Sequence, residues 1–333
     1  MDWNKGYSAR YDLRRVDPRT MADAEELRFT GGSIDRTDDD LMESADLDMT
    51  ETPAGTECWV RIYLEARQDG VPTRSALFTG LTSAPVRNIT GNRESWRVEC
   101  YSVLKPAEDM LLEPGWYAPS GVEGAQLASE LLGCGPAPVE RETGSPALRE
   151  YLVAESGETR LSMARKIIEA IGWRLRIGGS GTIRIEPRPT DPIRAFGQEN
   201  DVVELSVSDE QDWFGCPNCL RVVSGNVYAV ARDDDPASAL STVNRGREVW
   251  AYESRVELSD GESLAAYARR RLCELQKPAR IISYTRRFDP DVRVGDLVEV
   301  RYPEEGIDGV FRVTTQSVKL GHNGATKEEA AGV

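Results

Sequence analysis

The sequence is nearly without histidine: among its 333 residues there is one, His322, in a polar stretch after the last expected strand. A Ser-His-Asp triad, a Cys-His pair and a two-histidine zinc motif all require a placed histidine, so these catalytic classes are excluded. The chain also lacks any run near the ~20 apolar residues that span a bilayer, and its first residues lack the apolar core of a signal peptide. We therefore expect no membrane insertion.

Positive charge is also scarce, with 41 Lys and Arg against 56 Asp and Glu and a net charge of −15. Tight binding to nucleic-acid phosphates needs clustered cations, so we expect no specific DNA binding. Passing contact is compatible with this charge, because an acidic wall lets DNA slide without sticking.

Six scattered cysteines form no disulfide framework. Cys216 and Cys219 make a CxxC motif, but no second pair of ligands lies at zinc spacing and no thioredoxin-like βαβ unit surrounds it. We interpret the two as core or turn cysteines, with a labile disulfide and a metal as the alternatives. We expect no catalytic residue, no cofactor and no metal site.

What the sequence does have is strand periodicity in two regions, separated by helical patterns. Val60, Ile62 and Leu64 alternate with polar or aromatic residues, which is typical of a half-buried strand, and five or six such strands predict a small β-barrel. Helical spacing over residues 122–132 and 161–171 precedes a hairpin over 173–185. Its Gly-Gly-Ser-Gly turn, residues 178–181, lies between strands and has no following lysine, so a phosphate loop is disfavoured.

The second half begins after a proline-rich stretch, residues 186–200, which predicts a linker. Ser259 and Glu262 have capping-box spacing, and Pro278 would end the helix that follows them. Strand periodicity then returns up to Leu320. We expect an N-terminal arm over residues 1–26, a first β-barrel over residues 27–105 and a small α+β module over residues 106–190. A second β-barrel over residues 191–320, with a covering helix over 260–277, and a C-terminal tail over residues 321–333 should follow.

The residues alone leave two other functional classes open, an enzyme and a sugar-binding module. Carboxylate pairs such as Asp289 and Asp291 allow a glycan-degrading enzyme, and tryptophans at element edges allow a non-catalytic sugar-binding module. Trp59 and Tyr63 alternate with the apolar residues of their strand, so we expect them on its outward face. Since Trp and Tyr are enriched at interfaces, these two are our candidate subunit-interface residues.

Several segments together resemble a known family. They are residues 218–225 (NCLRVVSG), 264–276 (LAAYARRRLCELQ) and 290–300 (PDVRVGDLVEV) in the second half, and residues 31–36 (GGSIDR) and 44–49 (SADLDM) in the first. This combination is similar to the baseplate hub or distal tail-tip ring proteins of long-tailed bacteriophages. The segments are patterns of turns and alternation without an invariant catalytic signature.

The resemblance implies an α+β, mainly β fold in which two tail-tube-like antiparallel β-barrels flank a small helix-plus-hairpin module. It implies a structural, non-enzymatic homotrimer that adapts the sixfold tail tube to a threefold tip and lines an acidic channel for DNA ejection. The implied partners are the tail tube or distal tail protein, a central spike or tip protein, the tape-measure protein and DNA in transient passage. The implied location is the tail tip of a virion assembled in the host cytoplasm.

Overall fold

The computed structural model of the chain describes residues 1, 3, 6–38, 41–51, 57–90, 93–197, 203–211, 213–224, 227–254, 263–276, 280–321 and 324–333. These residues form a mainly β fold of the α+β class, as the sequence predicts. The chain divides into two compact units, residues 1–207 with 283–330 and residues 208–282 with 331–333. Of the helices that the described residues form, none has both the length and the apolar content to cross a membrane.

A sheet of 14 strands, counted over the described residues, dominates the fold. Its N-terminal strands are β1 (Ser8–Val16), β2 (Asp23–Leu27), β3 (Phe29–Arg36), β4 (Glu43–Met49), β5 (Trp59–Gln68), β6 (Val71–Thr82), β7 (Val86–Thr90) and β8 (Arg93–Ser102). Its later strands are β14 (Arg194–Gly197), β15 (Val203–Gln211), β19 (Arg280–Arg287), β20 (Leu297–Tyr302), β21 (Ile307–Leu320) and β22 (Ala325–Gly332). The strand order is β15-β19-β22-β21-β3-β4-β8-β6-β5-β1-β2, with β14-β20 joined at β21 and β7 at β8.

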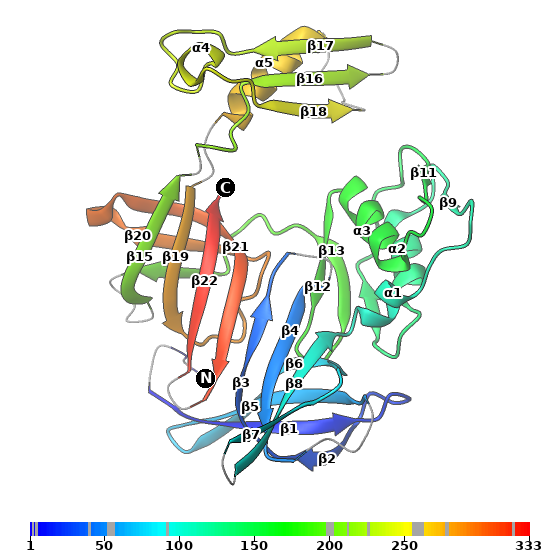
Figure 1. Cartoon of the computed structure of the whole chain (residues 1–333), viewed down its shortest axis with the longest axis vertical. Helices are drawn as coiled ribbons and strands as arrows, with labels where there is room; N and C mark the ends of the chain where they lie inside the picture. Colours follow the sequence, from blue (N-terminus) through cyan, green and yellow to red (C-terminus); the bar gives the residue numbers. More distant parts are fainter. Residues whose placement is uncertain are drawn as a thin grey trace. The chain divides into compact units, whose positions relative to one another are not determined.

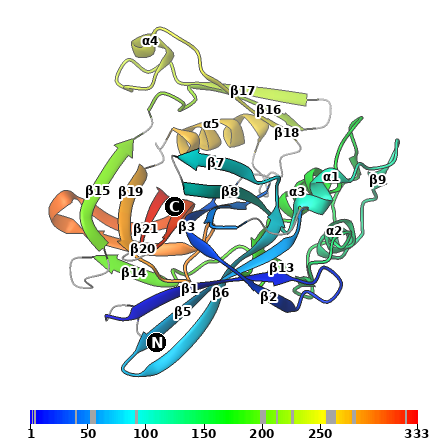
Figure 2. The ribbon, with the colours of Figure 1, turned by 60° about the horizontal axis from the view of Figure 1, so that its bottom comes forward.

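The N-terminal strands confirm the period-2 reading of residues 27–105. Val60, Ile62 and Leu64 of β5 are at most 1% exposed and share one buried cluster with residues of β3, β4, β6 and β8. The first residues do more than form an arm, since β1 pairs with β5 along its whole length (Figure 2). Leu13 lies opposite Ile62. Leu13 joins the same buried cluster, which explains why this segment folds onto the sheet.

One long strand, β21, joins the two sets of strands that were expected in separate barrels. Its first half pairs with β20, and its second half pairs with β3, where Val318 lies opposite Ile34. Most of the segment 321–333, which was expected to be a tail, forms β22 between β19 and β21. Its alternating pattern is built from threonine, alanine and glutamate, which carry too little apolar character to reveal a strand.

The small α+β module confirms the helix and hairpin predictions for residues 106–190. It contains α1 (Lys105–Asp109), β9 (Tyr117–Ala118), α2 (Gly124–Leu132), β10 (Val139–Arg141), β11 (Leu152–Val153), α3 (Arg160–Ala170), β12 (Trp173–Ile177) and β13 (Ile183–Pro187). Thr159 caps α3 by accepting a hydrogen bond from the Ser162 amide. Helices α2 and α3 lie against each other beside β12 and β13 (Figure 1) and build a core from residues such as Ile167 and Ile185.

The second unit holds a three-stranded sheet, β17 (Val227–Arg232), β16 (Cys219–Ser224) and β18 (Trp250–Ser254), in that order, with α4 (Thr242–Arg245) and α5 (Leu264–Leu275). Ser263 caps α5, which lies along one face of this sheet in both views (Figures 1 and 2). The expected helix limits, with Ser259, Glu262 and Pro278, lie outside the described residues, as does His322.

The expected second domain, residues 191–320, therefore corresponds to parts of both units. Its covering helix packs against β16 and β17 through Ala268 and Leu272, whereas β19 to β22 extend the large sheet. The expected linker is also shorter than predicted, since residues 194–197 form β14, which runs parallel to β20. The sequence did not predict this four-residue strand, because the three prolines just before it indicate a linker.

Candidate functional site

Two features of the described residues stand out as candidate sites: an exposed aromatic sheet face in the second unit and a buried ionic junction in the first. The aromatic face is the side of the β17-β16-β18 sheet opposite α5. Leu220, Val222 and Ala231 point to α5 and are buried with it. Because side chains alternate along each strand, the residues between them point the other way.

The aromatic face consists of Arg221, Tyr228, Val230, Trp250 and Tyr252. Arg221 lies opposite Val230 on one side and Tyr252 on the other. Its guanidinium lies over the Trp250 ring, 5.4 Å from the ring centroid. Tyr228, Val230, Trp250 and Tyr252 are between 42% and 70% exposed. A gathering of large apolar side chains on one sheet face is typical of a protein contact surface.

The sequence analysis missed this face, although it contained the signal. Trp250 and Tyr252 are two residues apart, with Ala251 between them packed toward the α5 core. An aromatic residue at every second position of a short strand predicts a face that is aromatic rather than solvated. The residues that point to the other side are Ala251, which packs against the α5 core, and Glu253, which accepts a hydrogen bond from Arg271 of α5. Helix α5 therefore covers that side of the strand.

Trp59, one of the two predicted interface residues, has a different position from the one expected. It is 8% exposed and belongs to the buried cluster that the α+β module builds, so the outward position is wrong. Its side of β5 is covered because the module lies over it: Arg61 donates from Nη2 to the Ser180 carbonyl oxygen, 2.9 Å away. The sheet is buried on both faces here, which strand alternation alone does not reveal.

Tyr63, the other predicted interface residue, is half-buried and held within the chain. Its hydroxyl donates to Asp23 Oδ2 at 2.7 Å, and the Arg74 guanidinium lies 3.6 Å from its ring centroid. Burial is the main reason that the pKa of Tyr63 is raised. Both residues thus have partners inside the chain, and an interface role for either stays a prediction.

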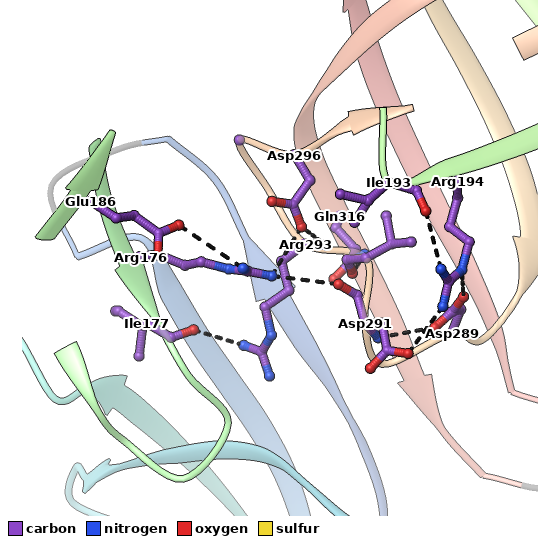
Figure 3. A network of polar contacts seen from close by, with 12 residues as sticks. Arg176, Ile177, Glu186, Ile193, Arg194, Asp289, Asp291, Arg293, Asp296 and Gln316 are labelled. Carbon is purple, nitrogen blue, oxygen red and sulfur yellow. Dashed lines mark hydrogen bonds and ion pairs between the residues drawn. The ribbon is translucent and has the colours of Figure 1, made fainter. Parts of the chain in front are cut away.

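The ionic junction lies where the N-terminal strands, the module and the loop of residues 288–296 meet (Figure 3). Arg293, 8% exposed, donates to the carbonyl oxygens of Ile177 in β12 (3.1 Å) and Leu77 in β6 (3.2 Å). Arg36 of β3 donates to the same Leu77 oxygen at 2.7 Å. Two buried arginines from distant parts of the sequence thus converge on one backbone carbonyl.

A β-bulge explains why this carbonyl takes two arginines. Ile62 lies opposite Phe78 and Tyr63 lies opposite Ala76, so Leu77 has no partner on β5. A bulged residue is left outside the ladder, and a buried carbonyl outside a ladder needs another donor. The guanidinium groups supply the missing hydrogen bonds.

Burial dominates the electrostatics of the junction. Burial, together with the neighbouring positive charge of Arg36, lowers the pKa of Arg293 to about 9. Burial also raises the pKa of Glu43, against the effect of Arg36 and Arg293. Glu43 Oε2 lies 3.3 Å from Arg36 Nε and 3.6 Å from Arg293 Nη1. One carboxylate thus forms ion pairs with two buried arginines.

Asp296, 1% exposed, fastens the module to the same loop. Its Oδ1 accepts from Arg174 Nη1 at 2.9 Å, and its Oδ2 accepts from Arg176 Nη2 at 3.1 Å and from the Arg293 amide at 3.0 Å. Glu186 lies on the strand beside them and accepts from Arg174 at 2.6 Å. Both arginines of β12 therefore face this loop.

Asp289 and Asp291, the carboxylate pair that allowed a glycan-degrading enzyme, are bridged by one arginine (Figure 3). Arg194 Nε lies 3.0 Å from Asp289 Oδ2, and Arg194 Nη2 lies 3.1 Å from Asp291 Oδ2. The pair therefore fixes β14 to the loop after β19. We assign it a structural role.

Cys216 and Cys219 are buried and form no disulfide, and burial raises the pKa of the Cys219 thiol. Cys219 begins β16 and Cys216 lies just before it, as expected of core and turn cysteines. The described residues contain no group of three or more His, Cys, Asp or Glu side chains placed to hold a metal ion.

The chain was compared with known protein families, curated sequences and solved structures. No family model matches the chain, and neither does any curated protein sequence. Solved structures do match. A tail protein from Neisseria meningitidis MC58 superimposes with a TM-score of 0.68 at 16% identity, over 98% of this chain and 97% of the other. The 43 kDa tail protein of prophage MuSo2 from Shewanella oneidensis gives 0.68 at 13% identity, over 97% and 98%.

A third match, prophage tail protein gp18 from Listeria monocytogenes EGD-e, gives a TM-score of 0.57 at 12% identity, over 96% of this chain and 94% of the other. At such identities the likeness is one of fold. It extends through both units and the module, so it covers the whole architecture rather than one common motif. The chain has the fold of bacteriophage tail proteins over nearly its entire length, in agreement with the resemblance found in its sequence.

Proposed function

We propose that the chain is a structural subunit of the distal tail, a hub that forms a homotrimeric ring between the tail tube and the tip. The observation that carries this proposal is the near full-length match in fold to prophage tail proteins. Three copies would present a threefold face to a spike or tip protein and a pseudo-sixfold face to the tube. The net charge of −15 suits a ring whose channel passes DNA without holding it.

The oligomeric state tests this proposal directly. We expect the purified chain to form trimers as its concentration rises, and a reconstruction of the tail to place three copies in a ring at the distal end. Native mass spectrometry measures the first and electron microscopy the second. A chain that stays monomeric at every concentration and is absent from the distal ring would contradict the hub role.

The aromatic face gives the ring a candidate contact surface. We propose that a neighbouring copy covers it, because a ring of identical chains needs a large apolar contact and this face offers one. Trp and Tyr are enriched among the few contact residues whose truncation costs about 2 kcal/mol or more. The central Arg221 also suits an acidic neighbour, and every copy carries an excess of acidic residues.

We expect the double substitution Trp250→Ser and Tyr252→Ser to weaken trimer formation by at least about tenfold, since it removes two aromatic anchors. The measurement is the concentration at which trimers appear in light scattering after size exclusion. Tyr151→Ser is the matched control, because Tyr151 is 63% exposed but lies in the module. Equal weakening by the control, or none by the double variant, would show that the trimer uses another surface.

A further inference from the structure

A cavity of about 210 Å³ in the first unit is lined by four arginines. Arg165 comes from α3, Arg174 from β12, Arg188 from the segment after β13, and Arg312 from β21. This concentration of positive charge is unusual in a chain whose net charge is −15. The cavity therefore needs an explanation beyond the general composition.

The four arginines differ in what holds them. Arg174 is engaged by Glu186 and Asp296, and Arg165 Nη2 donates to the Asp38 carbonyl oxygen at 2.6 Å. Among the residues that the structure describes, neither the guanidinium of Arg188 nor that of Arg312 makes a hydrogen bond or an ion pair. Two guanidinium groups thus line one cavity and donate to no side chain or carbonyl among the described residues.

Arg312 is moreover half-buried, and its neighbours along β21, Phe311 and Val313, belong to the core. Burial lowers its pKa, and the nearby positive charge of Arg188 lowers it further, while Asp38 acts in the opposite direction. Like charges that are partly removed from water repel each other and lose hydration. An anion entering the cavity would relieve both costs.

The remaining walls indicate what kind of anion fits. They include the apolar surfaces of Trp173, Leu175 and Val294. A guanidinium binds a carboxylate through two parallel hydrogen bonds, and the apolar walls suit the methylene stem that carries such a carboxylate. Nucleic acid is disfavoured, because Asp38 and Glu169 also line the cavity and the chain as a whole repels a polyanion.

We propose that this cavity receives an acidic side chain of a neighbouring tail subunit, which pairs with Arg188 and Arg312. The inference rests on the proposed role as a tail subunit, since it needs an adjoining chain to supply the carboxylate. It assigns a second contact, one of charge, in addition to the aromatic face. Acid-rich copies of this same chain have the required chemistry.

The test uses the full chain and glutarate, a small carboxylate with an apolar stem, as the probe. We expect glutarate to bind in calorimetry, and Arg188→Gln and Arg312→Gln each to weaken that binding by about tenfold, as the loss of a charged hydrogen-bond donor does. Arg184→Gln is the matched control, because Arg184 lies on β13 but pairs with Glu140 away from the cavity. Its affinity for glutarate should equal that of the unmodified chain.

The melting temperature, measured without glutarate, checks that each variant is folded. Arg312→Gln should melt at the same or a higher temperature than the unmodified chain, because the substitution removes a crowded, half-buried charge. Failure of the unmodified chain to bind glutarate, or equal binding by both pocket variants, would overturn the inference. Arginine-dependent binding of an oligonucleotide would assign the cavity to nucleic acid and would likewise overturn it.

Assembly measurements separate this inference from the proposed function. Trimers that form with unchanged affinity in the Arg188→Gln and Arg312→Gln variants would refute the subunit contact while leaving the hub role standing. An unmodified chain that binds glutarate but never assembles would refute the hub role and support only the carboxylate site. Weaker assembly in both pocket variants and normal assembly in Arg184→Gln is the result we expect.

Discussion

Replacing Glu328 by glutamine is expected to lower the free energy of unfolding by about 3–5 kcal/mol, the usual cost of leaving a buried charge without its partner. Glu328 and Arg286 both have side chains that are 0% exposed. The two carboxylate oxygens lie 2.6 Å and 2.8 Å from Arg286 Nη2 and Nε. An amide in the same place turns an N–H group toward the guanidinium and removes the negative charge.

Gln316 makes this substitution more severe than an isolated ion pair would suggest. Its Nε2 donates to Glu328 Oε1 at 2.5 Å and to the Val292 carbonyl oxygen at 2.8 Å, while its Oε1 accepts from Arg36 at 2.5 Å. The pair is thus connected to the junction around Leu77. Losing the carboxylate disturbs a network rather than a single contact.

Chemical denaturation measures this effect. Glu329→Gln is the matched control on the same strand, because Glu329 is only half-buried, and it should change stability by no more than about 0.5 kcal/mol. The double variant Arg286→Met and Glu328→Met should recover most of the loss, since neither charge then remains buried alone. A Glu328→Gln variant as stable as its control would show that water solvates Arg286 in place of the carboxylate.

The second large effect is expected from Gly179→Ala in the turn between β12 and β13. A Cβ atom at Gly179 would lie 1.9 Å from the backbone oxygen of Ala76 and 2.5 Å from its carbonyl carbon. Real side chains do not approach backbone this closely, so the turn or β6 has to move. Overpacking of this kind costs about 1–3 kcal/mol or more, and here we expect the upper end because the contact is with backbone.

This close approach positions the module on the sheet. Thr79 donates to the Gly179 carbonyl oxygen at 2.8 Å, and Arg61 holds the next carbonyl, that of Ser180. Displacing the turn therefore breaks both hydrogen bonds. Thermal unfolding of the variant should show a lower Tm, together with faster proteolysis of the module.

Gly178→Ala is the matched control, one residue away in the same turn. Its added Cβ would meet nothing closer than 3.6 Å, an ordinary van der Waals contact. It is expected to be neutral or to raise stability by about 0.4–1 kcal/mol by restricting the unfolded chain. Equal losses for the two variants would show that the glycine composition of the turn matters and the close approach does not.

The sequence predicted much of this fold because alternation and helical spacing are local properties. The strand β5 and the helices α2 and α3 were found in this way. What it did not predict depends on contacts between distant segments. Trp59 was placed outward because nothing local reveals that the module covers β5, and Glu328 was assigned to a tail because its partner Arg286 is 42 residues away.

The candidate sites show the same division. The aromatic face was within reach of local reasoning, since Trp250 and Tyr252 alternate with Ala251 on one strand. The arginine cavity was not, because Arg188 and Arg312 come from elements more than a hundred residues apart. No pattern along the chain marks residues whose only relation is that they line the same space.

The pairing of β21 with β3 has a consequence for the time course of synthesis. Arg36 lies opposite Gln316, so the ribosome releases β3 long before its neighbour exists. Until then β3 presents an open edge, and unpaired edges of nascent sheets invite aggregation. Such distant pairings also form slowly. The N-terminal sheet is therefore completed only after β21 has been synthesised.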